Sequence, residues 1–302
     1  MGPGRCFRVM NVKSPIIDTV VIGGSAGAFG VLKTLLGALP PDLPAVVLVT
    51  LHRGATEVAT LASLLGRYSA LPTSDAEDGG SLAPGRVVFA PMDRHMLVGR
   101  DHLHLRRGPT ENGFRPAIDP LFRSAAVYRP TRTIGVVLSG RLDDGASGLR
   151  ALARVGGHAF VQDQSDAPAP DMPAAAAAVV PVARSGDAAG IAAGIAELAG
   201  RPAAVPGTTP ADVATELTLA ALEDATMSMT ESLGTLSPYN CPDCNGVLWE
   251  IDDGGLARYR CHTGHGSTAD TLVAKQAEAL ARGLEDSLRA QRGHAALLKQ
   301  MA

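Results

Sequence analysis

Apolar segments that resemble strands alternate with segments that resemble helices over about residues 17–199. Strands are expected at 16–22, 45–51, 86–90, 133–139, 158–162 and 179–182, and helices at 27–37, 57–66, 120–128, 145–155 and 187–198. Several of the strands are continuously apolar, which is typical of strands covered on both faces. The alternation predicts an α/β fold: a doubly wound, mostly parallel sheet with helices on both faces.

Local signals refine this pattern. Asp119-Pro120 indicates a helix start with Asp119 as N-cap, and Asp171-Met172-Pro173 indicates another start. The segment 86–106 is expected to form a small antiparallel excursion of short strands around His95 and around 102–104.

Three prolines in segment 200–210 make it the best domain boundary. We expect an N-terminal extension (1–16), a catalytic domain (17–199), a linker (200–210) and a C-terminal part (211–302). That part is predicted to hold a helix near 211–222, a Cys/His hairpin module at about 238–267 and a final helix. Apolar residues recur at helical spacing in the final helix, at Val273, Ala277, Leu280, Leu284 and Leu288.

Composition narrows the class of partners. The formal net charge of −3 implies no general attraction to nucleic acid or to an anionic membrane. No apolar run approaches the roughly 20 residues of a membrane span, and the N-terminus lacks the apolar core of a secretory signal. The 4 cysteines do not form a disulfide framework, so the cytoplasm is the expected compartment.

Ser25 lies in the sequence Gly23-Gly24-Ser25-Ala26-Gly27, which fits G-x-S-x-G between a predicted strand and a predicted helix. In that context a sharp turn lifts the serine hydroxyl above the sheet edge. The N–H groups of Ala26 and Gly27 would face outward at a helix N-terminus, where they can bind an oxyanion. The dinucleotide fingerprint G-x-G-x-x-G is not matched, and an ordinary turn is the remaining alternative.

A nucleophilic serine needs a base, usually a histidine, and an acid that orients it. His52 directly follows the predicted strand 45–51, at the carboxyl end where ligands bind in parallel sheets. Asp143 and Asp144 follow the strand 133–139, and one of the two could instead be a helix N-cap. The chain order Ser, His, Asp disfavours the α/β-hydrolase fold.

Four ordered motifs resemble the catalytic domain of chemotaxis-type protein-glutamate methylesterases (CheB): 23–27, His52, 115–126 and 138–148. The resemblance covers about residues 18–198. It implies Ser25 as nucleophile, His52 as base and Asp144, rather than Asp143, as acid. It also implies hydrolysis of glutamate methyl esters on a chemoreceptor or related signalling protein, with glutamine deamidation as a side activity. A methyltransferase and a histidine kinase are the further partners to consider, and no organic cofactor is implied.

The sequence departs from the family in three places. About 16 residues precede the first predicted strand, so we expect no receiver domain and no regulation by phosphorylation within this chain. Arg141 and Leu142 replace a glycine and a methionine often found before the acid, and Ala28 stands where glycine is usual, which would narrow the mouth of the site. Arg123 and Arg115 are candidate contacts for receptor carboxylates, and a bracing role in the fold is the alternative.

A cysteine module follows, with Cys241-Pro-Asp-Cys244 and then Cys261-His262-Thr-Gly-His265. Two such pairs around a predicted hairpin, 247–251 and 256–260, are typical of a zinc ribbon. We expect a closed structural zinc site made of Cys241, Cys244, Cys261 and His265, with His262 as the substitute for His265. A hairpin without metal, with Trp249 buried, is the alternative.

Two other functions remain open from the sequence. The first is a non-catalytic signalling scaffold that binds receptor or kinase partners through the esterase fold; the altered Arg141-Leu142 turn and the cysteine module motivate it. The second is a hydrolase of small esters, which would turn over free methyl esters without a receptor.

Overall fold

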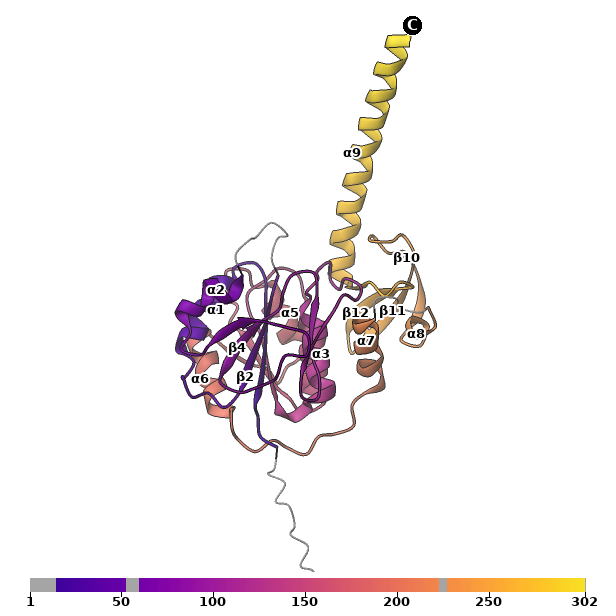
Figure 1. Cartoon of the computed structure of the whole chain (residues 1–302). Helices are drawn as coiled ribbons and strands as arrows, with labels where there is room; N and C mark the ends of the chain where they lie inside the picture. Colours follow the sequence, from indigo (N-terminus) through magenta and orange to yellow (C-terminus); the bar gives the residue numbers. More distant parts are fainter. Residues whose placement is uncertain (1–14, 53–59, 223–226, 302) are drawn as a thin grey trace, which may run out of the picture.

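A seven-stranded parallel sheet forms the centre of the molecule (Figure 1). The computed structural model describes residues 15–52, 60–222 and 227–301. Within them the strand order is β3-β4-β2-β1-β7-β8-β9, and every neighbouring pair is parallel. The strand bounds are β1 Thr19–Gly24, β2 Val46–Leu51, β3 Thr73–Asp75, β4 Arg86–Phe89, β7 Thr133–Val137, β8 His158–Gln162 and β9 Arg184–Gly186.

Helices cover both faces of this sheet. One face carries α1 (Ala28–Ala38), α2 (Leu61–Leu65) and α6 (Ala188–Leu198). The other carries α3 (Ile118–Tyr128), α4 (Ala146–Arg154) and α5 (Asp171–Val179). Successive strand residues point to opposite faces, so Val20 and Ile22 pack in the first layer and Val21 packs in the second. The predicted doubly wound α/β fold is confirmed.

Most predicted elements are confirmed, with shifted ends. The short strands β5 (His95–Val98) and β6 (Leu103–Arg106) form the expected antiparallel pair, and a helix does begin at Asp171. Of the predicted helix 57–66, α2 covers part, and residues 57–59 lie outside the described residues. Two 3-10 turns, η1 (Gly66–Tyr68) and η2 (Pro130–Arg132), were not predicted.

Two local predictions are wrong. No strand forms at 179–182, because Val179 is the last residue of α5 and Val182 is 79% exposed. Asp119 is not the N-cap of α3: that position is Ala117, and Asp119 lies in the first turn. Its carboxylate accepts instead from the N–H groups of Gly145 and Gly148, at 3.1 and 2.7 Å, and so ties α3 to α4.

The C-terminal part packs beside the parallel sheet (Figure 1). Its elements are α7 (Ala211–Ala221), α8 (Met227–Glu231), β10 (Thr235–Asn240), β11 (Val247–Asp253), β12 (Leu256–Cys261), β13 (Gly266–Thr268) and α9 (Ala269–Met301). The four strands form one antiparallel sheet, and β11 and β12 form the expected hairpin. None of the helices in the described ranges combines the length and the apolar character that a membrane span needs.

A buried ionic cluster joins the two parts. Glu216 of α7 accepts from Arg258 at 2.7 Å and from Arg260 at 3.0 Å, both on β12. Arg260 also lies 3.1 Å from Glu111, which pairs with Arg123 of α3. Removing one member of such a cluster leaves an uncompensated buried charge, which typically costs about 3–5 kcal/mol. The cluster therefore fixes the C-terminal part against the loop that precedes α3.

We expect His95, at the start of β5, to make the free energy of unfolding depend on pH. The ring is fully buried: Nε2 donates to the Pro109 carbonyl at 2.9 Å, and Nδ1 accepts from the Ala117 N–H at 3.3 Å. Burial lowers the pKa of His95 below its usual 6.5, although the charge of Glu111 opposes the shift. Below pH 6.5 the unfolded chain therefore takes up a proton that folded His95 resists.

We expect the free energy of unfolding to fall by up to about 1.4 kcal/mol per pH unit as pH drops from 6.5 toward the lowered pKa of His95. Denaturant melts at pH 7.0 and 5.5 measure the effect. The variant His95→Gln keeps a donor and an acceptor but cannot titrate, so its stability should fall less. An equal fall in both proteins would contradict this role for His95.

Candidate active site

Ser25 lies on the tight turn between β1 and α1. β1 ends at Gly24, and α1 begins at Ala28 after Gly27, whose φ of 78° is the left-handed conformation that glycine tolerates best. The Ser25 N–H donates to the Ser139 carbonyl at 2.9 Å, which ties the turn to the end of β7. A Cβ on Gly24 would lie 2.6 Å from the Cβ of Ala28, so glycine permits this close approach.

The Ala26–Gly27 peptide is held in a fixed orientation. Ser139 Oγ donates to the Ala26 carbonyl at 2.7 Å. In a trans peptide the N–H points opposite to the C=O, so the Gly27 N–H points away from Ser139. Ala26 and Gly27 are exposed, and no side chain of the described residues caps α1. The positive end of a helix dipole therefore stands open beside Ser25.

His52 follows β2 and adjoins Ser25 through the backbone. Its N–H donates to the Gly24 carbonyl at 3.1 Å. Its Nε2 lies 2.8 Å from Asp144 Oδ2, and its ring stacks on Phe114 with centroids 3.7 Å apart and planes 12° apart. Nδ1 is buried and has no hydrogen-bond partner among the described residues. The imidazole thus has one fixed nitrogen and one available nitrogen.

Asp144 is surrounded by donors. Besides His52, its carboxylate accepts from the N–H groups of Ile118 and Asp119, at 2.7 and 3.2 Å, and from Asn112 Nδ2 at 2.8 Å. Burial raises the pKa of Asp144, but the hydrogen bonds from His52, Ile118 and Asn112 outweigh it, and the pKa lies below its usual value. Because an ionised carboxylate can only accept, Nε2 of His52 is the donor in this hydrogen bond, and Nδ1 is the nitrogen without a partner among the described residues.

These groups meet at the carboxyl ends of β1, β2 and β7. β1 lies between β2 and β7. The strands that follow β1 in the chain are added first on its β2 side and later on its β7 side, and such a switch point is the usual ligand position in open α/β sheets. A Cβ on Gly140, just after β7, would lie 3.0 Å from Ser25 Cβ. The structure thus brings His52 and Asp144 into contact and places Ser25 on the adjoining turn.

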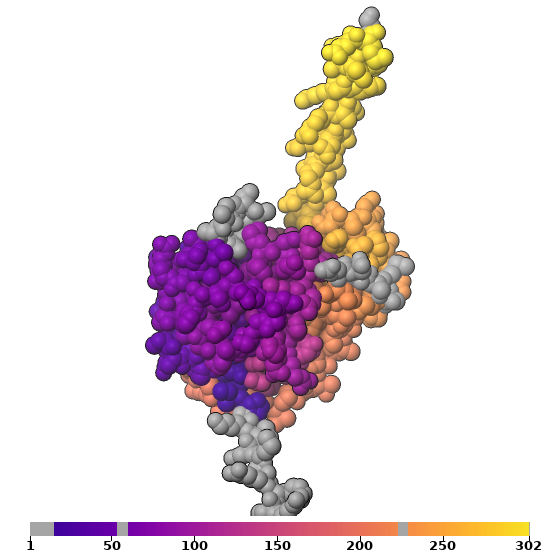
Figure 2. All heavy atoms as spheres, viewed as in Figure 1, coloured from indigo at the N-terminus to yellow at the C-terminus, as the bar shows by residue number. Residues whose placement is uncertain are grey.

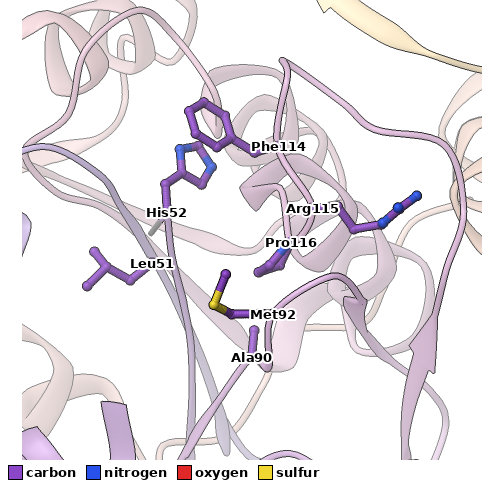
Figure 3. Close-up of a pocket in the computed structure, with 7 residues that line it drawn as sticks. All are labelled: Leu51, His52, Ala90, Met92, Phe114, Arg115 and Pro116. Carbon is purple, nitrogen blue, oxygen red and sulfur yellow. The ribbon is translucent and has the colours of Figure 1, made fainter. Parts of the chain in front are cut away.

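A small pocket of about 20 Å³ borders His52 (Figure 3). Its walls are mostly apolar and come from β2, from the end of β4 and from the segment before α3; they are Leu51, His52, Ala90, Met92, Phe114, Arg115 and Pro116. In Figure 3 Phe114 lies over His52, while Met92 and Pro116 lie below it. The cavity has room for about one water-sized group beside the imidazole.

The two candidate arginines have different surroundings. Arg123 is 1% exposed and pairs with Glu111 and Glu216 in the buried ionic cluster, so its guanidinium cannot reach a bound protein. This placement corrects the expectation that Arg123 binds substrate. Arg115 lines the pocket, and its Nη2 pairs with Asp93 at 2.6 Å.

The two departures near the site have local explanations. Ala28 is fully buried under Gly24, so it does not narrow the mouth of the site, contrary to expectation. Leu142 has a φ of 62°, a left-handed conformation that costs a non-glycine residue about 1–2 kcal/mol. Arg141 is exposed.

Relieving Leu142 should stabilise the fold. We expect Leu142→Gly to raise the free energy of unfolding by about 0.5–1 kcal/mol. Relief of the backbone strain stabilises the fold, and the lost packing of a half-buried side chain offsets part of that gain. Leu142→Ala is the matched control, because it removes the same packing but keeps the penalty. Denaturant melts compare the three proteins; a glycine variant no more stable than the alanine variant would contradict the expectation.

The four expected ligands in the C-terminal part do come together. Their ligand atoms, from Cys241, Cys244, Cys261 and His265, all lie within 4.8 Å of one another. Cys261 Sγ is 3.6 Å from Cys244 Sγ and 3.5 Å from His265 Nδ1. Tetrahedral ligands at zinc bond lengths of 2.0–2.3 Å lie about 3.5–3.8 Å apart. The group can therefore bind a metal ion, and His262 is not part of it.

Three site residues were not predicted from the sequence: Asn112, Phe114 and Ile118. Asn112 donates to the carboxylate of Asp144, Phe114 stacks on His52, and the Ile118 N–H contacts Asp144. All three lie in or next to the irregular segment between β6 and α3. The 115–126 motif adjoins this segment and was the one available signal.

Comparison with known proteins decides the family. The family model described as CheB methylesterase matches residues 20–195, more than half of the chain. The chain belongs to the CheB methylesterase family. The match includes Ser25, His52 and Asp144 and stops before the C-terminal part.

Curated relatives are also named as methylesterases. A protein-glutamate methylesterase/protein-glutamine glutaminase of Anaeromyxobacter dehalogenans is 40% identical over 150 residues, 48% of this chain and 41% of the relative. One of Methanosarcina mazei is 37% identical over 162 residues, 51% of this chain and 44% of the relative. The chain thus spans less than half the length of these two relatives.

A solved structure agrees with the fold. The CheB methylesterase catalytic domain of Thermotoga maritima superposes with a TM-score of 0.58 at 29% identity. The superposition covers 60% of this chain and 98% of that domain.

Proposed function

We propose that this chain is a serine esterase that hydrolyses glutamate methyl esters on a chemoreceptor or a related signalling protein. The observation that carries the proposal is the His52–Asp144 hydrogen bond beside Ser25, at the sheet edge of a CheB methylesterase domain. The names of the relatives support the ester substrate and glutamine deamidation as a side activity.

The residues divide the work as follows. Ser25 Oγ attacks the ester carbonyl carbon while His52 Nδ1 takes the hydroxyl proton. Asp144 holds the proton on Nε2 and stabilises the imidazolium. The C–O bond to the methoxy group breaks, and the proton on Nδ1 passes to the leaving methanol. Water then attacks the acyl-enzyme, which releases the glutamate carboxylate and regenerates Ser25.

The turn after Ser25 would stabilise the tetrahedral oxyanion. The N–H groups of Ala26 and Gly27 are the donors, and the Ser139 contact to the Ala26 carbonyl presents the Gly27 N–H outward. Loss of one oxyanion donor typically costs about 100–1,000-fold in turnover. The apolar residues beside His52 would contact the apolar part of the substrate side chain.

We further propose that Cys241, Cys244, Cys261 and His265 hold a structural zinc ion. Four protein ligands close the site, so the metal would cross-link β10, β12 and the turns beside them and take no part in ester hydrolysis. The reaction would occur in the cytoplasm, with a methyltransferase supplying the esters and a kinase pathway reading the receptor.

Methanol release distinguishes the substrate classes. Purified protein is incubated with a methylated cytoplasmic receptor fragment and, separately, with a free glutamate methyl ester. We expect release from the receptor at a much higher kcat/KM. Equal turnover of the free ester would indicate a small-ester hydrolase. No methanol release from either substrate would refute the esterase proposal and favour a non-catalytic signalling scaffold.

A further inference from the structure

The last helix leaves the body of the protein. α9 has 33 residues, and in the described chain Thr271 and Leu272 near its start are its only buried residues. Figures 1 and 2 show its C-terminal half standing clear of every other described element. A helix of this length is not held by its own backbone alone and usually packs through an apolar face.

α9 does have such a face. Apolar side chains recur every three or four residues at Val273, Ala277, Leu280, Leu284, Leu288, Ala295 and Leu298. The spacing places them in one stripe along the helix, interrupted by Gln291. Leu280 is 66% exposed and Leu284 is 59% exposed. The stripe spans about 39 Å at 1.5 Å per residue.

Charges beside the stripe identify what can cover it. Along one flank Glu278 and Glu285 are followed by Arg292 and Lys299, each seven residues after the last. In an antiparallel pair of identical helices this flank faces itself, and one register places Glu278 opposite Lys299 and Glu285 opposite Arg292. A parallel pair would make neither contact. Charges in these flanking positions set orientation in coiled coils.

We propose that α9 binds α9 of a second copy of this chain as an antiparallel two-helix coiled coil. The apolar stripes form the interface, and the two-fold axis passes near Leu288. Each acidic flank residue of one copy pairs with a basic one of the other, and symmetry makes every pair twice. The arrangement places the two esterase domains at opposite ends of the helical pair.

Sedimentation equilibrium of the full chain tests the pairing. The protein should be a dimer, and Leu280→Asp with Leu284→Asp should be a monomer with unchanged thermal unfolding of the body. A wild-type monomer at tens of micromolar, or a dimer that survives both substitutions, would overturn the proposal.

Charge reversal tests the direction. Glu285→Arg should raise the dimer dissociation constant about five- to tenfold, since it sets two like-charged pairs. Adding Arg292→Glu in the same chain should restore the affinity, because each new arginine then faces a new glutamate. Asp286→Arg, one residue away but off this flank, should leave it unchanged. If the added Arg292→Glu substitution does not restore the dimer affinity, the antiparallel register is contradicted.

Asn112 connects the carboxylate of Asp144 with β13 of the C-terminal part. It is 5% exposed, and its Nδ2 donates to Asp144 at 2.8 Å and to Asp119 at 3.1 Å. Its Oδ1 accepts from the Thr268 N–H at 3.1 Å, and its own N–H donates to the Gly266 carbonyl at 2.8 Å. β13 therefore fixes which side of the amide faces the carboxylates.

We infer that Asn112 is a positioning residue for Asp144, and that the C-terminal part sets its orientation. The inference rests on the proposed function. With Oδ1 of Asp144 held by Asn112, Oδ2 stays directed at His52 Nε2. The C-terminal part thus contributes to the geometry of a site to which it supplies no reacting group.

The test uses Asn112→Ala, with the exposed Asn240→Ala as matched control. In Asn112→Ala, kcat should fall about 10–100-fold with KM unchanged, and the low-field ¹H signal of the His52 Nε2–H should shift or vanish. The NMR signal is assigned by its absence in His52→Ala and is read without substrate, so it reports on Asn112 even if the esterase proposal fails. An unchanged signal would overturn the inference.

Discussion

Asp144→Asn is expected to lower kcat by about 10⁴-fold without unfolding the protein. The wild-type carboxylate accepts a hydrogen bond from the Nε2–H of His52, with 2.8 Å between Nε2 and Oδ2, so that Nδ1 is free to act as base. An asparagine whose oxygen takes the place of Oδ1, on Asn112 Nδ2 and the Asp119 N–H, presents its NH₂ group to His52 Nε2. The imidazole then carries its proton on Nδ1, where it cannot accept one from Ser25.

Asp143→Asn is the matched control for this prediction. Asp143 is equally buried but accepts from Thr268 and Thr271, at 2.6 and 3.2 Å, and does not contact His52. We expect kcat of this variant to stay within about tenfold of wild type. Steady-state methanol release and circular dichroism measure both variants. A folded Asp144→Asn protein that keeps more than a tenth of the wild-type kcat would contradict the assignment of the acid.

Loss of the metal should unfold the Cys/His module. The apolar cluster there holds five buried residues, Cys241, Leu248, Tyr259, Cys261 and Leu272, and two of them are themselves ligands. So small a core needs a cross-link, and structural zinc contributes about 10–16 kcal/mol in small zinc domains. We expect about one zinc per chain by elemental analysis, and cooperative unfolding of the module when a strong chelator removes it.

Trp249 reports the change. It is the single tryptophan of the chain, lies on β11 and is 6% exposed, so unfolding of the module should shift its fluorescence to the red. His265→Ala should lose the zinc, and His262→Ala should keep it, because the His262 ring packs against Gly246 outside the ligand group. Protein purified without chelator that holds far less than one zinc, or His262→Ala protein that loses it, would contradict the ligand set.

The sequence predicted the inner strands of the sheet well and its edges poorly. β1, β2, β7 and β8 are buried on both faces and therefore appear as apolar runs. The edge strands β3 and β9 have three residues each and are largely polar, so no such run marks them. Conversely, the apolar run at 179–182 follows an alanine-rich helix that begins at Asp171, and Pro181 comes just after that helix ends.

The site shows the same division. Ser25, His52 and Asp144 each follow a recognisable strand, and parallel strands bring their carboxyl ends to one edge, so their approach could be expected. Asn112 and Phe114 lie on an irregular loop, where neither periodicity nor a motif fixes the position of a side chain. Buried Arg123 pairs with Glu111 and with Glu216. Glu216 comes more than 90 residues later in the chain, and no local pattern encodes that pairing.

We propose that Ser25 is the nucleophile of a glutamate methylesterase. The most direct test is methanol release from a methylated receptor fragment by the wild-type protein and by Ser25→Ala at equal concentration. We predict steady release by the wild type and a loss of about 10⁴-fold or more in the variant, with unchanged circular dichroism. Equal release by the two folded proteins would contradict the role of Ser25 as nucleophile.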